Sequence, residues 1–331
     1  MPSTVLILGA RGRFGLAVAR AFCDAGWRVL GQVRPGAAVP AAPRVEWLAT
    51  DLQNTQALAL AAQGATVVVH ALNPAYTHKA WRTQVAPMMD AAIAIARALD
   101  ATLMLPGNVY NFGAAMPAVL REDTPQVGQT VKGQIRIALE AQLQHSGVRG
   151  VVIRAGDFFG SGRGTWFDQV IVKDIQKGKF TYPGQRDVAT AWAYLPDLAR
   201  TFVAVAERRA QLGGFEIFHF KGRSMTGQQW LDALDPIARV QGWVKPEGHV
   251  SFNRLPWPLM RIGALFVPTF AALSEMRYLW DTPHTLANDK LKALIGAEPH
   301  TPLSFAVQRA LGDLGLMAAS DQGNHGFAKA A

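Results

Sequence analysis

An apolar run that leads directly into three evenly spaced glycines constrains the fold of this chain most strongly. The segment LILGARGRFG, residues 6–15, joins a strand-like run to glycines at positions 9, 12 and 15, and a helical pattern begins near residue 13. In a strand–turn–helix unit, the first glycine permits a sharp turn, the second lets the backbone approach a pyrophosphate, and the third packs helix against strand. The pyrophosphate then lies at the positive end of the helix dipole. The segment therefore predicts a dinucleotide-binding loop, formed by Gly9, Ala10, Arg11, Gly12, Arg13, Phe14 and Gly15.

The first 156 residues alternate between strand-like and helix-like patterns. Continuous apolar runs such as ATVVVHAL, residues 65–72, suit strands that are covered on both faces. The patterns predict strands at 5–8, 27–33, 44–50, 65–72, 101–107 and 148–156, with helices at 13–25, 52–64, 81–99 and 128–146. This order predicts an α/β protein with a doubly wound parallel Rossmann sheet and right-handed crossovers.

The alternation ends after residue 156, and a smaller mixed α/β unit is expected to follow. Helices are predicted near 165–177, 194–209 and 301–316, with strands at 215–220 and 249–252. We therefore expect 1–156 to form the NAD(P)-binding domain and 195–222 to return to it. The substrate-binding or capping region would comprise 157–194 and 223–318, and residues 319–331 would form a flexible tail.

Composition and charge narrow the partners that we expect. Half of the 331 residues are apolar and 17% are charged, which is a globular composition. The net charge of +9 raises the question of nucleic acid, but the Lys and Arg residues are scattered rather than arranged in a block or stripe. We therefore predict a small-molecule substrate and no nucleic-acid partner. Cys23 is the only cysteine, which excludes an internal disulfide and favours a reducing, cytoplasmic location.

Neither a leader nor a membrane span is predicted. The opening MPSTVLILGARGR has no basic region before its apolar run, and we interpret it as a first strand. The most apolar stretch, LPWPLMRIGALFVPTFAAL at 255–273, contains Arg261 and three prolines. It is better interpreted as a buried or pocket-lining helix pair, so no membrane partner is expected.

The end of the second strand bears on the choice of nucleotide. An NAD site usually has an acidic residue there to hold the ribose 2′-hydroxyl, but WRVLGQVRPG offers none. Arg34, with Arg11 or Arg13, could instead hold a 2′-phosphate, which favours NADP(H) with NAD(H) as the alternative. Asp51 suits the adenine edge or a helix N-cap, and the two roles are compatible. Other residues expected to contact the cofactor are Leu52, Ala71, Leu72, Asn73, Pro106, Lys132 and Arg154.

These motifs resemble those of a known superfamily. GxxGxxG, DL at 51–52 and VVVHALNP at 67–74 resemble the short-chain dehydrogenase/reductase superfamily, above all its extended and atypical, epimerase/dehydratase-like branches. VVIRAGDFFGSG (151–162), AWAYLPDLART (191–201) and TLANDKLKALIGAEPHTPLSFAVQRAL (285–311) extend the resemblance over most of the chain. The resemblance implies a Ser near the end of strand five and Tyr-x-x-x-Lys on the next helix. This sequence has Pro106 or Gly107 in place of the Ser, Lys132 at the Tyr position and Arg136 at the Lys position. A tyrosinate mechanism therefore does not transfer.

The helix VKGQIRIALEAQL is more similar to that of isoflavone reductase-like and NmrA-like proteins, which have a Lys-x-x-x-Arg-x-x-x-Glu pattern. Lys132, Arg136 and Glu140 match it, and the resemblance implies Lys132 as the acid or base. A spacing of four places the three side chains on one helix face. We expect burial and repulsion from Arg136 to lower the pKa of Lys132, and Glu140 to pair with Arg136. The alternative is an amphipathic helix with a surface salt bridge and a solvated Lys132.

Other candidates for the site lie at strand ends. Asn108 and Tyr110 follow strand five, where open α/β sheets bind ligands, although Tyr110 could equally be a core phenol. His70 is expected to be a core imidazole, and no spacing of ligand residues predicts a metal site. Five large residues are expected to line an apolar pocket or to form plain core: Trp166, Phe167, Trp192, Trp257 and Met260.

The sequence thus predicts an NADP(H)-dependent oxidoreductase. It would transfer hydride to or from an apolar or aromatic carbonyl or conjugated substrate, with Lys132 as acid/base, and the resemblance implies a homodimer. Two other functions stay open. One is a sugar-nucleotide epimerase or dehydratase, for which Arg163, Arg186 and Lys221 are the candidate basic contacts. The other is a non-catalytic regulator that senses NADP.

Overall fold

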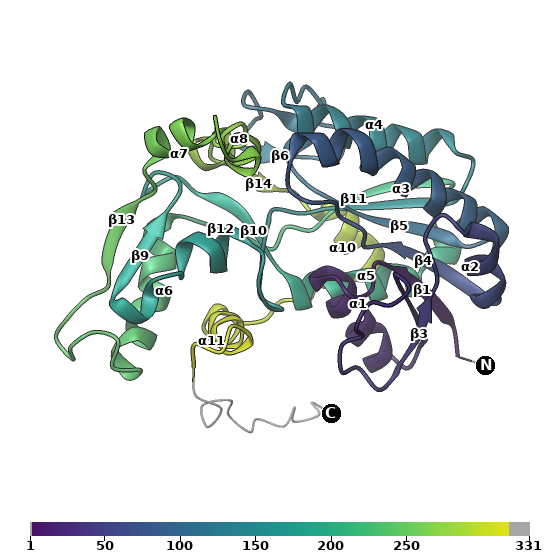
Figure 1. The fold of residues 1–331 in the computed structure, drawn as a ribbon, viewed down its shortest axis with the longest axis horizontal. Helices are drawn as coiled ribbons and strands as arrows, with labels where there is room; N and C mark the ends of the chain where they lie inside the picture. The colour runs from purple at the N-terminus through teal and green to yellow at the C-terminus, as the bar shows by residue number, and fades with distance from the viewer. Residues whose placement is uncertain (1, 318–331) are drawn as a thin grey trace.

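A seven-stranded sheet organises the larger lobe of the computed structural model, which describes residues 2–317 (Figure 1). All of its strand pairs are parallel. In spatial order the strands are β11 (Phe215–His219), β7 (Gly150–Arg154), β5 (Thr102–Gly107), β4 (Ala65–His70), β1 (Thr4–Leu8), β2 (Arg28–Val33) and β3 (Val45–Ala49). The chain winds outward from β1 in one direction and from β4 in the other. This reversal confirms the predicted doubly wound sheet.

Helices cover both faces of this sheet. On one face, α1 (Arg13–Asp24) packs against α5 (Leu195–Glu207), with α10 (Asp289–Ile295) beside it. On the other face, α3 (His78–Ala98) packs between α2 (Thr55–Ala61) and α4 (Val131–His145). Successive side chains of β1 point to opposite faces of the sheet. Val5 and Ile7 pack in the core beneath α1 and α5, and Leu6 and Leu8 pack in the core beneath α2, α3 and α4.

The smaller lobe has its own aromatic core. It contains two small sheets and two helices that pack on each other: β12 (Arg223–Met225), β10 (Thr190–Tyr194) and β8 (Asp157–Phe159); β13 (Ser251–Arg254) and β9 (Lys179–Tyr182); and α6 (Gly227–Val240) with α11 (Leu303–Asp313). Buried Trp192, Trp230 and Trp280 lie at its centre, with ring centroids 4.9 to 5.5 Å apart where they contact. Phe167, Trp192 and Trp257 are buried in this core and Trp166 and Met260 pack against it, so the five expected pocket residues form core.

Several short elements lie between the longer helices and strands. They are η1 (Tyr110–Phe112), β6 (Val119–Leu120) with its partner β14 (Thr285–Leu286), η4 (Arg209–Gln211) and α9 (Tyr278–Asp281). The strand predicted at 215–220 pairs with β7, and the helix predicted at 194–209 packs on α1, so both lie in the larger lobe. The predicted tail at 319–331 lies outside the described residues.

The helix predicted at 165–177 is wrong. A π-helical turn, η2 (Phe167–Ile171), and a 3-10 turn, η3 (Ile175–Lys177), replace it. The Asp168 carboxylate accepts hydrogen bonds from the backbone N–H groups of Gly164 and Thr165, and this local bonding competes with a regular helix. Elsewhere the helices expected at 52–64 and 301–316 are shorter, and the one expected at 81–99 begins earlier, with Thr77 as N-cap.

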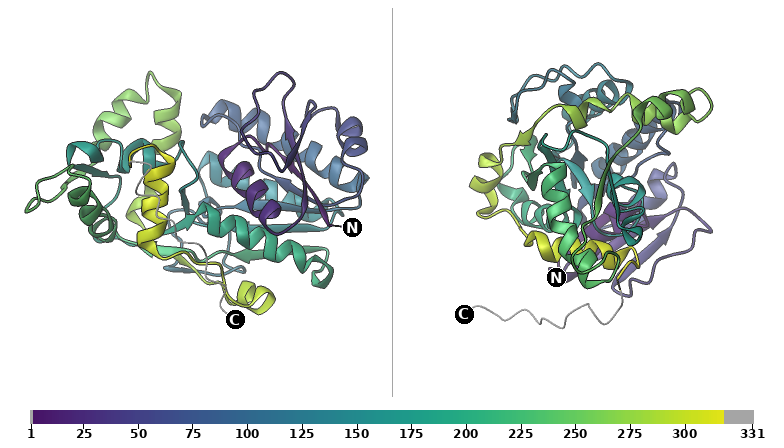
Figure 2. Two further views of the ribbon diagram at one scale, coloured as in Figure 1. Left: turned by 90° about the horizontal axis from the view of Figure 1, so that it is seen from below. Right: turned by 90° about the vertical axis from the view of Figure 1, so that its left-hand side faces the viewer.

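The apolar stretch at 255–273 forms the predicted helix pair, α7 (Trp257–Gly263) and α8 (Pro268–Ser274). The two helices pack on each other at the edge of the smaller lobe (Figure 2). Most of the pair is not buried, contrary to the expectation, since Leu265 and Phe266 at its tip are 79% and 81% exposed. Among the described residues, no helix is long and apolar enough to cross a membrane.

Candidate functional site

The glycine loop lies where the carboxyl ends of β1 and β4 meet. Gly9 has a φ of +76°, and a Cβ there would lie 3.1 Å from the backbone oxygen of Ala71. A Cβ on Gly15 would lie 2.5 Å from the Gly9 oxygen, so α1 approaches the loop too closely for any side chain. Helix α1 begins after Gly12 with no side-chain cap and no acidic residue in its first turn. Its free N-terminus is therefore suited to an anion.

Gln32 ties the loop to the ends of two further strands. Its Oε1 accepts a hydrogen bond from the Gly9 backbone N–H at 3.1 Å, and its Nε2 donates to the Thr50 oxygen at 2.9 Å. The side chain is buried, and both ends of its amide are used within the protein. Arg34 follows β2 on the exposed surface, so the end of this strand presents a cation and no carboxylate.

The residues that directly follow β3 and β4 are exposed or only partly buried. Asp51 is exposed and its Oδ1 accepts from the Gln53 backbone N–H, whereas Asn54 is the N-cap of α2. The suggested N-cap role of Asp51 is therefore wrong. Among the predicted cofactor contacts, Leu52, Ala71 and Leu72 are partly buried near the loop and Asn73 is exposed.

The two arginines of the loop differ in their surroundings. Arg11 is exposed, whereas Arg13 extends to the smaller lobe and donates from Nη1 to the Arg163 oxygen at 3.0 Å. Burial lowers the pKa of Arg13, and the nearby Asp168 carboxylate opposes that shift. Its Nε is buried and has no hydrogen-bond partner within residues 2–317. This arginine thus joins the start of α1 to the 161–168 loop and retains an unused donor.

Two partly buried phenols face each other beyond the ends of β4 and β5. The hydroxyls of Tyr76 and Tyr110 lie 3.3 Å apart, and both rings pack near Trp81. Burial raises the pKa of Tyr110 to about 12 and that of Tyr76 well above its usual value. Both phenols are therefore neutral near pH 7, and either can donate a proton in a hydrogen bond. Asn108 Oδ1 accepts from the Tyr110 backbone N–H, so it shapes this turn.

Asp157 is a site residue that the sequence reasoning missed. It starts β8 next to the end of β7, and burial raises the pKa of its carboxyl group to about 7. Its charge also contributes to the raised pKa values of Tyr76 and Tyr110, which places it within electrostatic reach of both. A single acidic residue after the apolar run VVIRAG was the available signal.

Lys132 is completely buried rather than solvated. Its Nζ donates to the Ala272 oxygen at 2.8 Å and to Glu275 Oε1 at 3.1 Å, and it lies 4.4 Å from the centroid of the Tyr76 ring. Burial beneath α8 lowers the pKa of Lys132, and Glu275 opposes the shift. Burial was one of the two predicted causes, whereas repulsion from Arg136, the other, is not among the causes.

Glu275 also holds the start of helix α4. Its two carboxylate oxygens accept from the backbone N–H groups of Val131 and Lys132 at 3.3 and 3.4 Å, and one lies 3.2 Å from His78 Nε2. A carboxylate at a helix N-terminus is stabilised by the helix dipole. Glu275 lies 143 residues from Lys132 in the chain, so no local pattern could have pointed to this contact.

The predicted pair of Glu140 with Arg136 is wrong. Glu140 pairs with Arg154 of β7, whose Nη2 lies 2.7 Å from Glu140 Oε2, and both side chains are buried. Arg154 was expected to contact the cofactor, but its guanidinium binds Glu140 and packs on the Phe112 ring. Arg136 instead donates to the Pro106 oxygen at 3.2 Å and packs on Trp81, and its Nε has no partner within the described residues.

His70, predicted to be a core imidazole, lies at the end of β4. Burial is the main cause that lowers its pKa to about 4. Its Nε2 has no partner among the described residues, so the imidazole is neutral but not fully satisfied. Within residues 2–317, no group of three or more His, Cys, Asp or Glu side chains could hold a metal.

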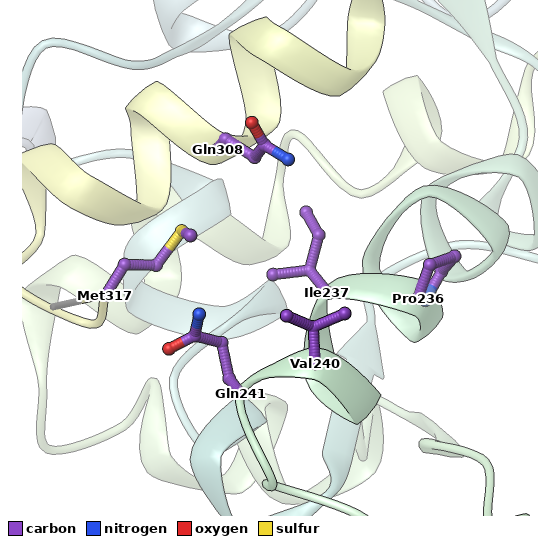
Figure 3. A pocket seen from close by; sticks show the side chains of 6 residues that line it. All are labelled: Pro236, Ile237, Val240, Gln241, Gln308 and Met317. Atoms are coloured by element: carbon purple, nitrogen blue, oxygen red, sulfur yellow. The ribbon is translucent and has the colours of Figure 1, made fainter. Parts of the chain in front are cut away.

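A separate pocket of about 240 Å³ lies between α6 and α11 in the smaller lobe (Figure 3). Its lining is mostly apolar and contains no charged side chain: Pro236, Ile237, Val240, Gln241, Gln308 and Met317. This lining offers no group for acid–base or hydride chemistry, so we do not place the reaction there.

Comparison with known proteins identifies the family. A family profile described as the RmlD substrate binding domain matches residues 3–247. The chain belongs to this family. It is accordingly a member of the short-chain dehydrogenase/reductase superfamily that its motifs predicted. No curated protein matches the chain.

Solved structures of this architecture cover almost the whole chain. A putative epimerase from Burkholderia cenocepacia J2315 is 20% identical with a TM-score of 0.73, covering 94% of this chain and 98% of its own. The Bordetella bronchiseptica enzyme WbmH in complex with NAD+ is 16% identical with a TM-score of 0.70, covering 95% and 98%. The Bacillus cereus UDP-glucuronic acid 4-epimerase in complex with NAD is 16% identical with a TM-score of 0.69, covering 93% and 96%. At these identities the likeness establishes the fold.

Proposed function

We propose that this chain is an oxidoreductase that binds a nicotinamide dinucleotide and transfers hydride to or from a small-molecule substrate. The observation that carries the proposal is the glycine loop at the free N-terminus of α1. At Gly9 and Gly15 a Cβ would meet backbone atoms, and no side chain caps the helix. The unused Nε of Arg13 adds a buried donor beside this helix terminus. These features fit a dinucleotide pyrophosphate.

NADP(H) is the proposed cofactor, with NAD(H) as the alternative to be tested. Support for NADP(H) comes from the end of β2, where Arg34 is exposed and position 32 is a glutamine rather than an acidic residue. A guanidinium binds a phosphate well. Support for NAD(H) comes from the solved structures of WbmH and the Bacillus cereus epimerase, which contain NAD.

A bound nicotinamide would supply or accept the hydride, and this chain would move the accompanying proton. We assign that proton to Lys132, whose Nζ lies 4.4 Å from the centroid of the Tyr76 ring and whose pKa is lowered by burial. Glu275, 18% exposed and 3.1 Å away, connects the amine to solvent. Tyr110, paired with Tyr76, is the proposed second donor, and Asn108 positions it.

The smaller lobe is the proposed substrate-binding part, and residues 157–194 and 223–318 are the proposed limits of that region. The proposed substrate stays an apolar or aromatic carbonyl or conjugated compound, and the aromatic side chains that suggested it form the core of this lobe. A homodimer and a cytoplasmic location complete the proposal.

A sugar-nucleotide epimerase or dehydratase is the second candidate, favoured by the names of the solved relatives. The basic contacts proposed for a nucleotide are largely engaged, since Arg163 donates to the Leu314 oxygen and Arg186 to Gln228. A hydride acceptor assay with carbonyl compounds and binding of UDP-sugars would distinguish the two candidates.

Calorimetry on a pair of glycine variants tests the cofactor site. Gly12→Ala puts a methyl group 3.2 Å from the Gly9 oxygen on the face offered to the pyrophosphate, at a φ of −65° that alanine adopts readily. The control is Gly214→Ala, since a Cβ there meets nothing within 4 Å. We expect the wild type and the control to bind NADP+ and the Gly12 variant to bind at least about tenfold more weakly. Absence of binding of either dinucleotide to the wild type would refute the proposal.

A further inference from the structure

The exposed apolar side chains of this protein concentrate on one feature, the tip of the α7–α8 hairpin. Of the eleven large apolar residues that are exposed among those described, five lie within residues 259–267. They are Leu259 (65% exposed), Ile262 (61%), Leu265 (79%), Phe266 (81%) and Val267 (40%). Single exposed apolar residues are ordinary, but a contiguous group marks a binding surface.

The hairpin is held firmly at its base, so its tip is not needed for the fold. Trp257 at the start of α7 is buried and donates from Nε1 to the Pro183 oxygen at 2.7 Å. Just after α8, Glu275 binds Lys132 and the start of α4. Between them the helices pack on each other, with the Phe270 ring 2.7 Å from where a Gly263 Cβ would lie. The tip therefore extends from an anchored base (Figure 2).

The hairpin itself carries no acidic side chain. Residues 248–274 contain no Asp or Glu, and the two arginines among them, Arg254 and Arg261, are exposed, whereas Glu275 follows α8 at the base of the hairpin. Neither arginine forms a salt bridge with a carboxylate within residues 2–317. The whole chain carries a net charge of +9, so a second copy would meet this surface with like charge.

We propose that the α7–α8 tip docks on an anionic lipid surface. Leu265 and Phe266 would enter the headgroup–acyl boundary while Arg261 contacts the lipid phosphates. An apolar tip that carries an unpaired cation has the chemistry that an anionic bilayer interface recognises. Docking of this kind differs from spanning, and it revises the expectation that the protein has no membrane partner.

Vesicle sedimentation tests the proposal directly. The full chain is mixed with vesicles of phosphatidylcholine alone or of phosphatidylcholine with phosphatidylglycerol. We expect it to sediment with the anionic vesicles, and the double variant Leu265→Ser/Phe266→Ser to partition at least about tenfold less. The matched control is Leu60→Ser, a residue 76% exposed on α2, which should bind like the wild type.

A charge variant separates the two contributions. Arg261→Gln should lower partition onto anionic vesicles by about fivefold and leave partition onto neutral vesicles unchanged, because only the lipid charge attracts the guanidinium. Both the tip and charge variants should melt at the wild-type temperature and bind dinucleotide as the wild type does. The test is thus independent of the proposed enzyme activity.

Three outcomes would overturn the proposal. The wild-type protein could stay in the supernatant with anionic vesicles, or Leu60→Ser could lose as much binding as the tip variant. The third outcome is a tip variant that changes the oligomeric state in light scattering while vesicle binding is absent, which would assign the surface to a second copy of the chain.

Discussion

Replacing Glu275 by glutamine should destabilise the protein and make its stability depend on pH in a specific way. The change removes the charge but keeps an oxygen acceptor facing the completely buried Lys132 amine at 3.1 Å. A buried charge that loses its partner typically costs about 3–5 kcal/mol. Because Glu275 remains 18% exposed and the Ala272 oxygen still accepts from the amine, we expect a loss of about 2–3 kcal/mol in the free energy of unfolding at pH 7.

The sign of the pH dependence follows from the lysine. In the folded Glu275→Gln protein the pKa of Lys132 should fall further below its usual value, because burial lowers it and the opposing carboxylate is gone. Between that folded pKa and the usual value of 10.5, the unfolded chain binds more protons than the folded one. Stability of the variant should therefore rise with pH in this range, and its deficit relative to the wild type should shrink.

Urea denaturation across pH, with a double-mutant cycle, measures both effects. Lys132→Met combined with Glu275→Gln should recover most of the loss, since an apolar residue in a buried position needs no counter-charge. The control is Glu46→Gln, which breaks the exposed pair with Arg28 and should cost less than about 1 kcal/mol. The reasoning would be refuted by a Glu275→Gln loss no larger than that of the control, or by a deficit that grows with pH.

Further variants test other parts of the structure. Glu140→Gln leaves the buried Arg154 without its charged partner, and it should lower the free energy of unfolding by about 3–5 kcal/mol in urea denaturation. Arg34→Ala should weaken NADP+ binding by about tenfold in calorimetry and leave NAD+ binding unchanged. Because the folded pKa of Asp157 is raised from 3.8 to about 7, wild-type stability should fall as pH rises through that interval, and Asp157→Asn should lack this fall.

Local sequence predicted the parts of the fold that depend on neighbours in the chain. The glycine spacing and the apolar run at 65–72 located the loop and the strand that meets it, because turns and strand periodicity are set within a few residues. The alternation of strand-like and helix-like patterns predicted the doubly wound parallel sheet. These features required no knowledge of distant contacts.

The interior of the site depends on contacts that the sequence could not reveal. Glu140 lies one helical turn from Arg136, which suggested the wrong pair, but the sheet brings Arg154 of β7 against it. Lys132 meets Glu275 only because α8 packs over the start of α4. The polar nature of Asp157 was visible in the sequence, but its raised pKa depends on burial between the lobes' elements. Tertiary contact, rather than helix spacing, decided both pairs and the burial of Asp157.

The position of Gln32 has a consequence for changing cofactor preference by mutation. Its amide carries out two tasks at once, accepting from Gly9 and donating to the Thr50 carbonyl. An aspartate introduced there to attract the ribose hydroxyls of NAD would have no donor for that carbonyl and would set two oxygens against each other. A change of nucleotide preference in this protein therefore requires substitutions at two or more positions. The loop between β3 and α2 must be redesigned together with the end of β2.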